Sequence, residues 1–322
     1  MYKKILKSLA LALAILVMAS STIAFADDEF VVGYDFGGNA CPYCAKIAGY
    51  IEQYAEEAGI KVILTTCDFD ALTQINNAES MIAQGAKVVG AIFCDKDACM
   101  PIADLCKAED ITCLATLCPL TDEANGYENY IFLGSENYDG GYKQGEWLAE
   151  YTGWKEGDDA LRIWYLDDHA GDQAGADRKA GFEGALKDLG VNYDIVACEF
   201  SNYSMDDGVI IMENWMQVYD DIDIVVSGAD LAVLGAITAY EAGGRDVEAV
   251  TWIGLDGQDA ALESVTEGKM DMTMLQDAET QAKEFIKLCC QIRDGEVKPS
   301  EVEDIYIPFV PIDATNISDF LK

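Results

Sequence analysis

Apolar residues recur along the chain in two alternating patterns, one typical of buried strands and one typical of helices. Short continuous apolar runs, bounded by glycine or polar residues, indicate strands that are covered on both faces of a parallel sheet. In the first half, such runs predict strands over 30–36, 61–66, 88–93, 112–116 and 130–133. Between them, apolar residues at helical spacing predict helices over 43–58, 70–84 and 98–109.

The second half repeats this alternation. Its apolar runs predict strands over 161–166, 193–199, 222–227, 249–255 and 271–275. Helical spacing predicts helices over 138–152, 174–189, 205–218, 229–242, 259–267 and 279–294, followed by an extended stretch over 306–312. Two successive rounds predict an α/β fold class, with two doubly wound parallel-sheet (Rossmann-like) domains.

The first 26 residues follow neither pattern. Lys3, Lys4 and Lys7 precede an apolar run over 9–17, and Ala24-Phe25-Ala26 has the small-x-small form of a signal peptidase site. We interpret residues 1–26 as a signal peptide that is cleaved before Asp27. The mature protein is therefore expected in the periplasm, or secreted outside the cell.

Composition narrows the classes of partner. The net charge of the 322 residues is −37, and the predicted signal peptide contributes only basic residues, so the mature chain is still more acidic. Such a charge repels nucleic acid and anionic lipid, which excludes both as expected partners. A hydrophobic content of 51% excludes a disordered chain.

Four glycine-containing segments, together with Pro42-Tyr43, occur in the order found in a known family. They are Gly134-Ser135-Glu136-Asn137-Tyr138-Asp139-Gly140-Gly141, Asp177-Arg178-Lys179-Ala180-Gly181-Phe182, Gly228-Ala229-Asp230-Leu231-Ala232-Val233-Leu234-Gly235-Ala236 and Ile253-Gly254-Leu255-Asp256-Gly257. With these segments, nearly the whole mature chain resembles the sugar-type periplasmic binding proteins of ABC importers, the group that includes ribose-binding protein.

The resemblance implies the type I periplasmic binding protein fold. Its N-terminal lobe would comprise 27–134 plus 277–308, and its C-terminal lobe 135–276 plus 309–322. Three strand crossings, near 133–136, 275–277 and 308–310, would form the hinge between the lobes.

The same resemblance implies a solute receptor without catalytic activity or cofactor. A monomer would capture one small ligand, a monosaccharide or related polyol, between its lobes. The closed form would then be recognised by an ABC transporter permease, or by a sensor kinase. A repressor of the same fold is not expected, because the chain is acidic and residues 1–29 do not resemble a DNA-binding segment.

Five residues match positions that bind ligand in this family. Tyr43 and Tyr203 stand where aromatic rings stack on the apolar face of a sugar. Arg178 stands at the hydroxyl-binding arginine, whose fork of donors spans two neighbouring oxygens. Asp256 stands at the carboxylate acceptor, and Gln276 at an amide near the hinge that both donates and accepts.

Other family positions are changed. An Asp-Arg pair of the N-terminal lobe falls on Leu117-Cys118, and an asparagine of the same lobe falls on Cys41, where Asn39 is a candidate replacement from the same loop. A further asparagine, next to Asp230, falls on Ala229. The first-lobe side of the cleft thus loses many of its hydroxyl-binding groups, which favours a ligand less polar than ribose.

Eleven cysteines allow three interpretations. Cys41-Pro42-Tyr43-Cys44 before a helix is the active-site string of glutaredoxins, so a thiol-disulfide oxidoreductase is one alternative. Cys41, Cys44, Cys67, Cys94 and Cys118 all follow strands of one predicted sheet, so a metal or iron–sulfur site is another. The third is packing by small residues with one or two disulfides. Cys99, Cys106 and Cys289-Cys290 are interpreted as packing residues of the first domain.

Overall fold

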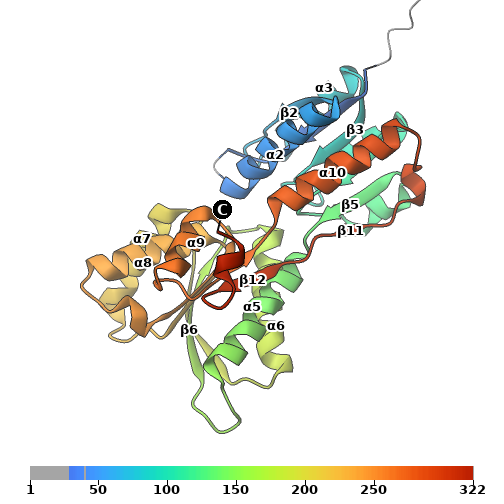
Figure 1. Ribbon diagram of the computed structural model, residues 1–322. Coiled ribbons are helices and arrows are strands. Elements are labelled where there is room, and N and C mark those ends of the chain that lie inside the picture. The colour runs from blue at the N-terminus through green and yellow to red at the C-terminus, as the bar shows by residue number, and fades with distance from the viewer. Residues whose placement is uncertain (1–28, 40, 322) are drawn as a thin grey trace, which may run out of the picture. The chain divides into compact units, whose positions relative to one another are not determined.

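The computed structural model describes residues 29–39 and 41–321, and the predicted signal peptide lies outside these residues. Two six-stranded sheets organise residues 31–321 (Figure 1). Their strand orders are β11-β5-β4-β3-β1-β2 and β12-β10-β9-β8-β6-β7. Each order is that of a doubly wound sheet: the second strand is added on one side of the first strand, and the following strands are added on its other side. The predicted fold class is confirmed.

The first sheet is parallel throughout. Its strands are β1 (Val31–Asp35), β2 (Lys61–Thr65), β3 (Ala86–Ala91), β4 (Thr112–Ala115), β5 (Tyr130–Gly134) and the short β11 (Ile305–Tyr306). Its helices are α2 (Pro42–Ala58), α3 (Ala71–Ala83), α4 (Met100–Ala108) and α10 (Ala278–Arg293), with the 3-10 turns η1 (Asp122–Gly126) and η3 (Pro299–Glu301). Although it is distant in sequence, α10 packs beside α2 (Figure 1).

The second sheet has the same winding. Its strands are β6 (Leu161–Asp167), β7 (Tyr193–Phe200), β8 (Ile224–Ser227), β9 (Thr251–Asp256), β10 (Met272–Leu275) and β12 (Val310–Asp313), which is antiparallel to β10. Its helices are α5 (Asn137–Thr152), α6 (Gln173–Asp188), α7 (Met205–Val218), α8 (Asp230–Ala242) and α9 (Asp259–Thr266), with the 3-10 turns η2 (Val247–Ala249) and η4 (Ile317–Asp319).

The extended stretch predicted over 306–312 is divided between the two sheets. Its first residue belongs to β11 beside β5, whereas Val310 begins β12 beside β10. Pro308 lies between them and Pro311 lies within β12. Because proline cannot donate a ladder hydrogen bond, it is confined to edge strands and connections, and β12 is an edge strand. The chain also passes from the first sheet to α5 after β5, and from β10 to α10.

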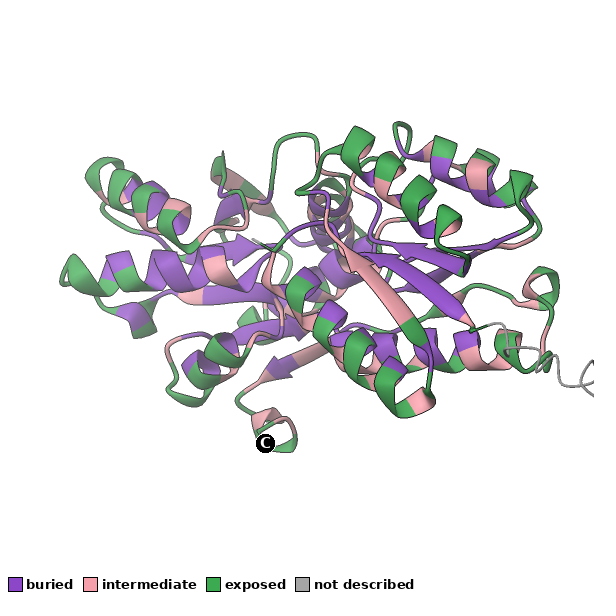
Figure 2. Ribbon diagram, turned by 90° about the horizontal axis from the view of Figure 1, so that it is seen from above, coloured by how far each residue is buried: buried purple, intermediate pink, exposed green. Residues whose placement is uncertain are grey.

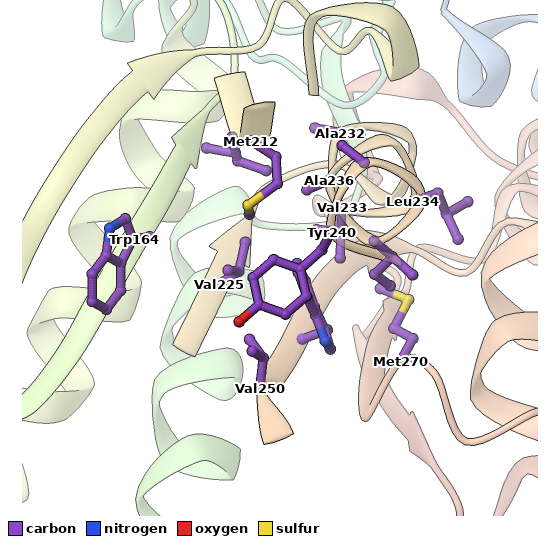
Figure 3. Packing of buried hydrophobic residues seen from close by; sticks show 14 of the residues in the cluster. Trp164, Met212, Val225, Ala232, Val233, Leu234, Ala236, Tyr240, Val250 and Met270 are labelled. Carbon is purple, nitrogen blue, oxygen red and sulfur yellow. The ribbon is translucent and has the colours of Figure 1, made fainter. Parts of the chain in front are cut away.

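Buried side chains fill the space between each sheet and its helices. Figure 2 shows the strands largely buried and the outer faces of the helices exposed. Figure 3 shows part of one cluster, in which Trp164 and Met212 pack with Tyr240 and other residues of α8. Trp252 is fully buried in the same cluster, and its indole N–H donates to Val247 O at 3.0 Å. These cores hold the carboxyl ends of the parallel strands in place, where the loops of the site begin.

No helix within the described residues combines the length and apolar character needed to cross a membrane.

Candidate ligand-binding cleft

A cleft of about 320 Å³ lies between loops that follow strands of both sheets. This is a usual size for a small-molecule site, and the carboxyl ends of parallel strands are where such sites form. From the first sheet, its lining comprises Cys41, Pro42, Tyr43, Cys44, Phe69, Ile92, Phe93, Cys94, Leu117 and Cys118. From the second sheet, its lining comprises His169, Ala170, Gly171, Asp172, Ala174, Arg178, Asn202, Tyr203, Ala229, Leu231, Asp256 and Gln276.

Tyr43 is held at the start of α2. Cys41 is the N-cap of this helix, with Pro42 at its first position, so the chain enters the helix with Tyr43 in the first turn. The Tyr43 hydroxyl donates to Gln281 Oε1, and Gln281 Nε2 donates to Leu133 O at 3.0 Å. Burial raises the pKa of Tyr43 well above its ordinary value, so the phenol stays neutral. The ring is therefore fixed as one side of the cleft.

Arg178 lies on α6 and is almost completely buried. Its Nε donates to Asn137 Oδ1 at 3.0 Å, and its Nη1 donates to Gly228 O at 2.7 Å. Its Nη2 donates to Gln276 Oε1 at 3.2 Å. These bonds orient the guanidinium toward the cleft. A guanidinium has five N–H donors. Among the described residues, only one of the two N–H groups on Nη2 has a partner, so the other is available to a ligand.

Glycines place Arg178 by letting α5 and α6 approach closely. A Cβ at Gly141 would lie 1.7 Å from Arg178 O, and one at Gly181 would lie 2.0 Å from Tyr138 O. Any side chain at either position would force the helices apart. The glycines of two segments that carry the family resemblance thus have a structural explanation.

Carboxyl groups surround the guanidinium. Asp168 Oδ2 lies 3.8 Å from Arg178 Nη1, and both side chains are buried. Burial raises the pKa of Asp168 to about 7, although the arginine opposes this rise. Burial also raises the pKa of Asp256 well above its ordinary range, again against the effect of Arg178. For Arg178 itself, burial lowers the pKa but the carboxyls, Asp168 foremost, raise it further, so this cation stays charged.

Tyr203 is fixed by a different carboxylate. Its hydroxyl donates to Asp172 Oδ2, which also accepts the Gly175 N–H as the N-cap of α6 at 2.6 Å. Burial raises the pKa of Tyr203 well above its ordinary value. The second tyrosine is therefore a neutral, oriented ring on the side of the second sheet.

Residues with unusual backbone angles are concentrated in the lining. Five non-glycine residues that line the cleft have positive φ: Phe69, Leu117, Asn202, Tyr203 and Asp256. Such conformations are unfavourable for side chains with a Cβ and persist where the surrounding structure enforces them, often at functional sites. Asp256 is the most extreme, with a φ of 128°. This distribution supports the cleft as the functional site.

The structure brings together seven of the eight residues that the sequence places in the site. Gln276 is among them, and its Nε2 is buried without a hydrogen-bond partner in the described part of the chain. Cys41 and Cys118 also line the cleft. Asn39 does not: it is exposed in the turn before α2 and does not contribute to the lining. The structure therefore gives Asn39 no position from which to replace the amide missing at Cys41.

The cysteines at the strand ends have different surroundings. Cys41 and Cys44 form a disulfide. Cys67 is buried, and its thiol donates to Gly37 O at 3.4 Å rather than lining the cleft. Cys94 Sγ lies 3.7 Å from Cys99 Sγ. Among residues 29–39 and 41–321, no three His, Cys, Asp or Glu side chains meet in an arrangement that could hold a metal ion.

Several lining residues were not predicted from the sequence. Phe69, Ile92 and Phe93 form much of the apolar wall, and Asp172 and Asn202 add polar groups opposite them. Ile92 and Phe93 end the strand predicted over 88–93, and Phe69 and Asn202 follow predicted strands by three residues, so their positions were a usable signal. The choice among neighbouring loop residues, however, depends on turns such as the one at Phe69, where φ is 60°.

Comparison with known proteins decides the family. The model of the periplasmic binding protein domain matches residues 32–296, which include every residue named above on the cleft wall. The chain belongs to the periplasmic binding protein family. The resemblance drawn from the sequence segments is thereby confirmed.

Individual proteins are also similar to this chain in sequence or in structure. The putative rhizopine-binding protein of Rhizobium meliloti is 32% identical over 127 residues, which cover 39% of this chain and 40% of that protein. The ribose import binding protein RbsB of Bacillus subtilis (strain 168) is 24% identical over 251 residues, which cover 78% and 77%. A solute binding protein of an ABC transporter from Bacillus halodurans C-125, crystallised with bound myo-inositol, superposes with a TM-score of 0.80 at 24% identity, covering 91% and 97%.

Proposed function

We propose that this periplasmic binding protein captures one small polyhydroxylated ligand, a monosaccharide or related polyol, in the cleft between its two sheets. The observation that carries the proposal is the convergence of Tyr43, Tyr203, Arg178, Asp256 and Gln276 on that one cleft. These residues lie at the carboxyl ends of strands of both sheets, or in the loops and helices that follow those strands. A ligand that contacts both sides therefore favours the arrangement in which they face each other.

The chemistry of these residues supports a sugar or polyol. Aromatic rings pack on the C–H face of a sugar, while a guanidinium, a carboxyl and an amide bind its hydroxyls. Gln276 Nε2 and one N–H of Arg178 are donors without a partner among the described residues, and Asp256 supplies an acceptor. Relatives named for ribose and crystallised with myo-inositol support the same class of ligand.

We infer that the lobes are 27–134 plus 277–308 and 135–276 plus 309–322, and that they move about the three connections between them. The topology supports this division, because each sheet uses strands from only one of these sets. In this proposal a signal peptide directs the chain to the periplasm or the cell exterior. A monomer then delivers its ligand to an ABC transporter permease, or presents it to a sensor kinase, and catalyses no reaction.

A thermal-shift panel tests the proposal. The mature protein is melted with monosaccharides, polyols, nucleosides and amino acids, each at millimolar concentration. A ligand at one hundred times its Kd adds about 2.7 kcal/mol to the free energy of unfolding, which raises the Tm by several degrees. A shift with at least one sugar or polyol is expected. Shifts only with amino acids or nucleosides, or with no compound, contradict the proposal.

A further inference from the structure

The two walls of the cleft differ sharply in polarity. The wall from the first sheet has no charged side chain among the described lining residues, and its largest members include Phe69, Ile92, Phe93 and Leu117. The wall from the second sheet contains Arg178, Asp172, Asp256, Asn202 and Gln276. A ligand held between them therefore meets an apolar surface on one side and a dense set of donors and acceptors on the other.

The polar side chains among the described residues of the first wall offer few free donors or acceptors. The Tyr43 hydroxyl is bonded to Gln281, and the disulfide between Cys41 and Cys44 removes both S–H donors. The backbone carbonyl of Leu117 accepts from Asn137 Nδ2 at 3.0 Å. Burial raises the pKa of Cys118, which keeps it a neutral thiol and at most a weak donor. A ligand hydroxyl directed at this wall would lose its bonds to water and gain little in return.

The second wall limits the charge of the ligand. Arg178 is the one guanidinium among the described lining residues, and three of its N–H groups are bonded to Asn137, Gly228 and Gln276. Its Nη1 also lies 3.8 Å from Asp168 Oδ2. Little of its donor capacity is therefore left for a ligand carboxylate or phosphate, which disfavours an anion. Hydroxyl groups, which both donate and accept, suit the free donors of Gln276 and Arg178 and the acceptor Asp256.

We infer that the ligand is an uncharged sugar or polyol with one apolar edge, a deoxy carbon or an O-methyl group, directed at the wall of Phe69, Ile92, Phe93 and Leu117. The hydroxyls of its other edge face Arg178, Asp256 and Gln276. This inference rests on the proposed function and narrows its class of ligand.

Isothermal titration with matched pairs of ligands tests it. The probes are D-galactose with D-fucose, L-mannose with L-rhamnose, and myo-inositol with its mono-O-methyl ether. Each pair differs by one hydroxyl that is removed or methylated. In every pair that binds, the deoxy or methylated member is expected to bind at least about ten-fold more tightly. A buried hydroxyl without a hydrogen-bond partner lowers the affinity by about this factor.

A substitution on the apolar wall checks where this preference originates. Leu117 has a φ of 69°, a conformation that asparagine tolerates well, so Leu117→Asn adds a polar group with little backbone strain. It is expected to reduce the preference at least three-fold. Leu72→Asn, at an exposed position that does not line the cleft, is the matched control and should leave the preference unchanged.

The outcomes separate the inference from the function on which it rests. If the fully hydroxylated parents bind as tightly as their deoxy or methylated partners, or more tightly, the inference is wrong while the proposed function stands. If no member of any pair binds, and no other sugar or polyol shifts the Tm, both are contradicted. The comparison of wild-type affinities needs no variant, so a failure of Leu117→Asn to fold leaves it intact.

Discussion

Asn137 links Arg178 to the opposite wall of the cleft. Its Oδ1 accepts from Arg178 Nε at 3.0 Å, and its Nδ2 donates to Leu117 O at 3.0 Å. Asn137 is the first residue of α5, directly after the connection that leaves the first sheet. One buried amide therefore joins the guanidinium of the second wall to the backbone of the first.

Substitution of Asn137 is expected to weaken ligand binding. Asn137→Ala removes both hydrogen bonds, one of them to a charged group, and leaves buried polar atoms unpaired, so affinity should fall about ten-fold or more. Asn137→Asp keeps an acceptor for Arg178 but cannot donate to Leu117 O, so it measures the contribution of the bond to Leu117 alone. Titration calorimetry measures both variants. Asn129→Ala, at a position outside the cleft, is the control, and an Asn137→Ala affinity equal to that of the control would contradict this role.

Tyr43 is expected to act mainly through its ring. Tyr43→Phe keeps the ring but leaves Gln281 Oε1 buried without its donor, which should lower the free energy of unfolding by about 1–3 kcal/mol. Its ligand affinity should stay within about five-fold of wild type. Tyr43→Leu removes the stacking surface and should weaken binding at least ten-fold. Tyr50→Leu, on the same helix but outside the cleft, is the control. Equal affinities for Tyr43→Phe and Tyr43→Leu, both reduced, would show that the hydroxyl matters instead.

The ion pair between Lys46 and Asp259 connects α2 to α9, and hence helices of the two sheets. Their charged atoms lie 3.0 Å apart, but the Asp259 side chain is 89% exposed. Exposed pairs of this kind contribute little and are screened by salt. Asp259→Asn should therefore change ligand affinity less than five-fold, and the change should vanish at 0.5 M NaCl. A larger, salt-independent loss would show that the pair holds the two sides of the cleft together.

The buried carboxyl of Asp168 makes stability depend on pH. Its pKa is about 7 in the folded protein, against an ordinary value of 3.8. Between these values the folded state keeps a proton that the unfolded state has lost. The free energy of unfolding should therefore fall as pH rises from about 4 to 7, by up to about 1.4 kcal/mol per pH unit from this group.

Asp168→Asn removes that titration. The Tm difference, variant minus wild type, should increase as the pH rises from 4.5 to 7.5, as measured by calorimetry. Asp220→Asn, on an exposed loop, is the control and should show a constant difference. A constant or declining difference for Asp168→Asn would contradict the burial effect.

Regular elements could be predicted from the sequence because buried strands give continuous apolar runs and helices give apolar residues at helical spacing. β1 is buried at all five positions, and α7 begins at Met205 and ends at Val218, as its apolar spacing indicates. The apolar run over 306–312 did not by itself show that this stretch divides between two sheets, although the family resemblance placed a crossing near 308–310. The division depends on strand pairing, because β11 pairs with β5 and β12 pairs with β10.

The side chains of the cleft were also predicted only in part. Arg178 and Asp256 were predicted because each lies in a segment with a recognisable family order. Phe69 was missed, because its contribution comes from a left-handed turn that the loop sequence does not specify. The cysteines show a further limit: Cys41-Pro42-Tyr43-Cys44 suits a redox site or a structural disulfide equally well by spacing. The structure shows the disulfide, and the family match over residues 32–296 favours a structural role.

The central claim is that one sugar or polyol binds in the cleft through residues of the second wall, and titration calorimetry of Asp256→Ala tests it most directly. The ligand is the compound with the largest thermal shift, and Asp259→Ala, three residues further on, is the control. We expect one site per chain, an affinity lowered at least 100-fold by Asp256→Ala, and a control within five-fold of wild type. Unchanged affinity in a folded Asp256→Ala protein would contradict the account.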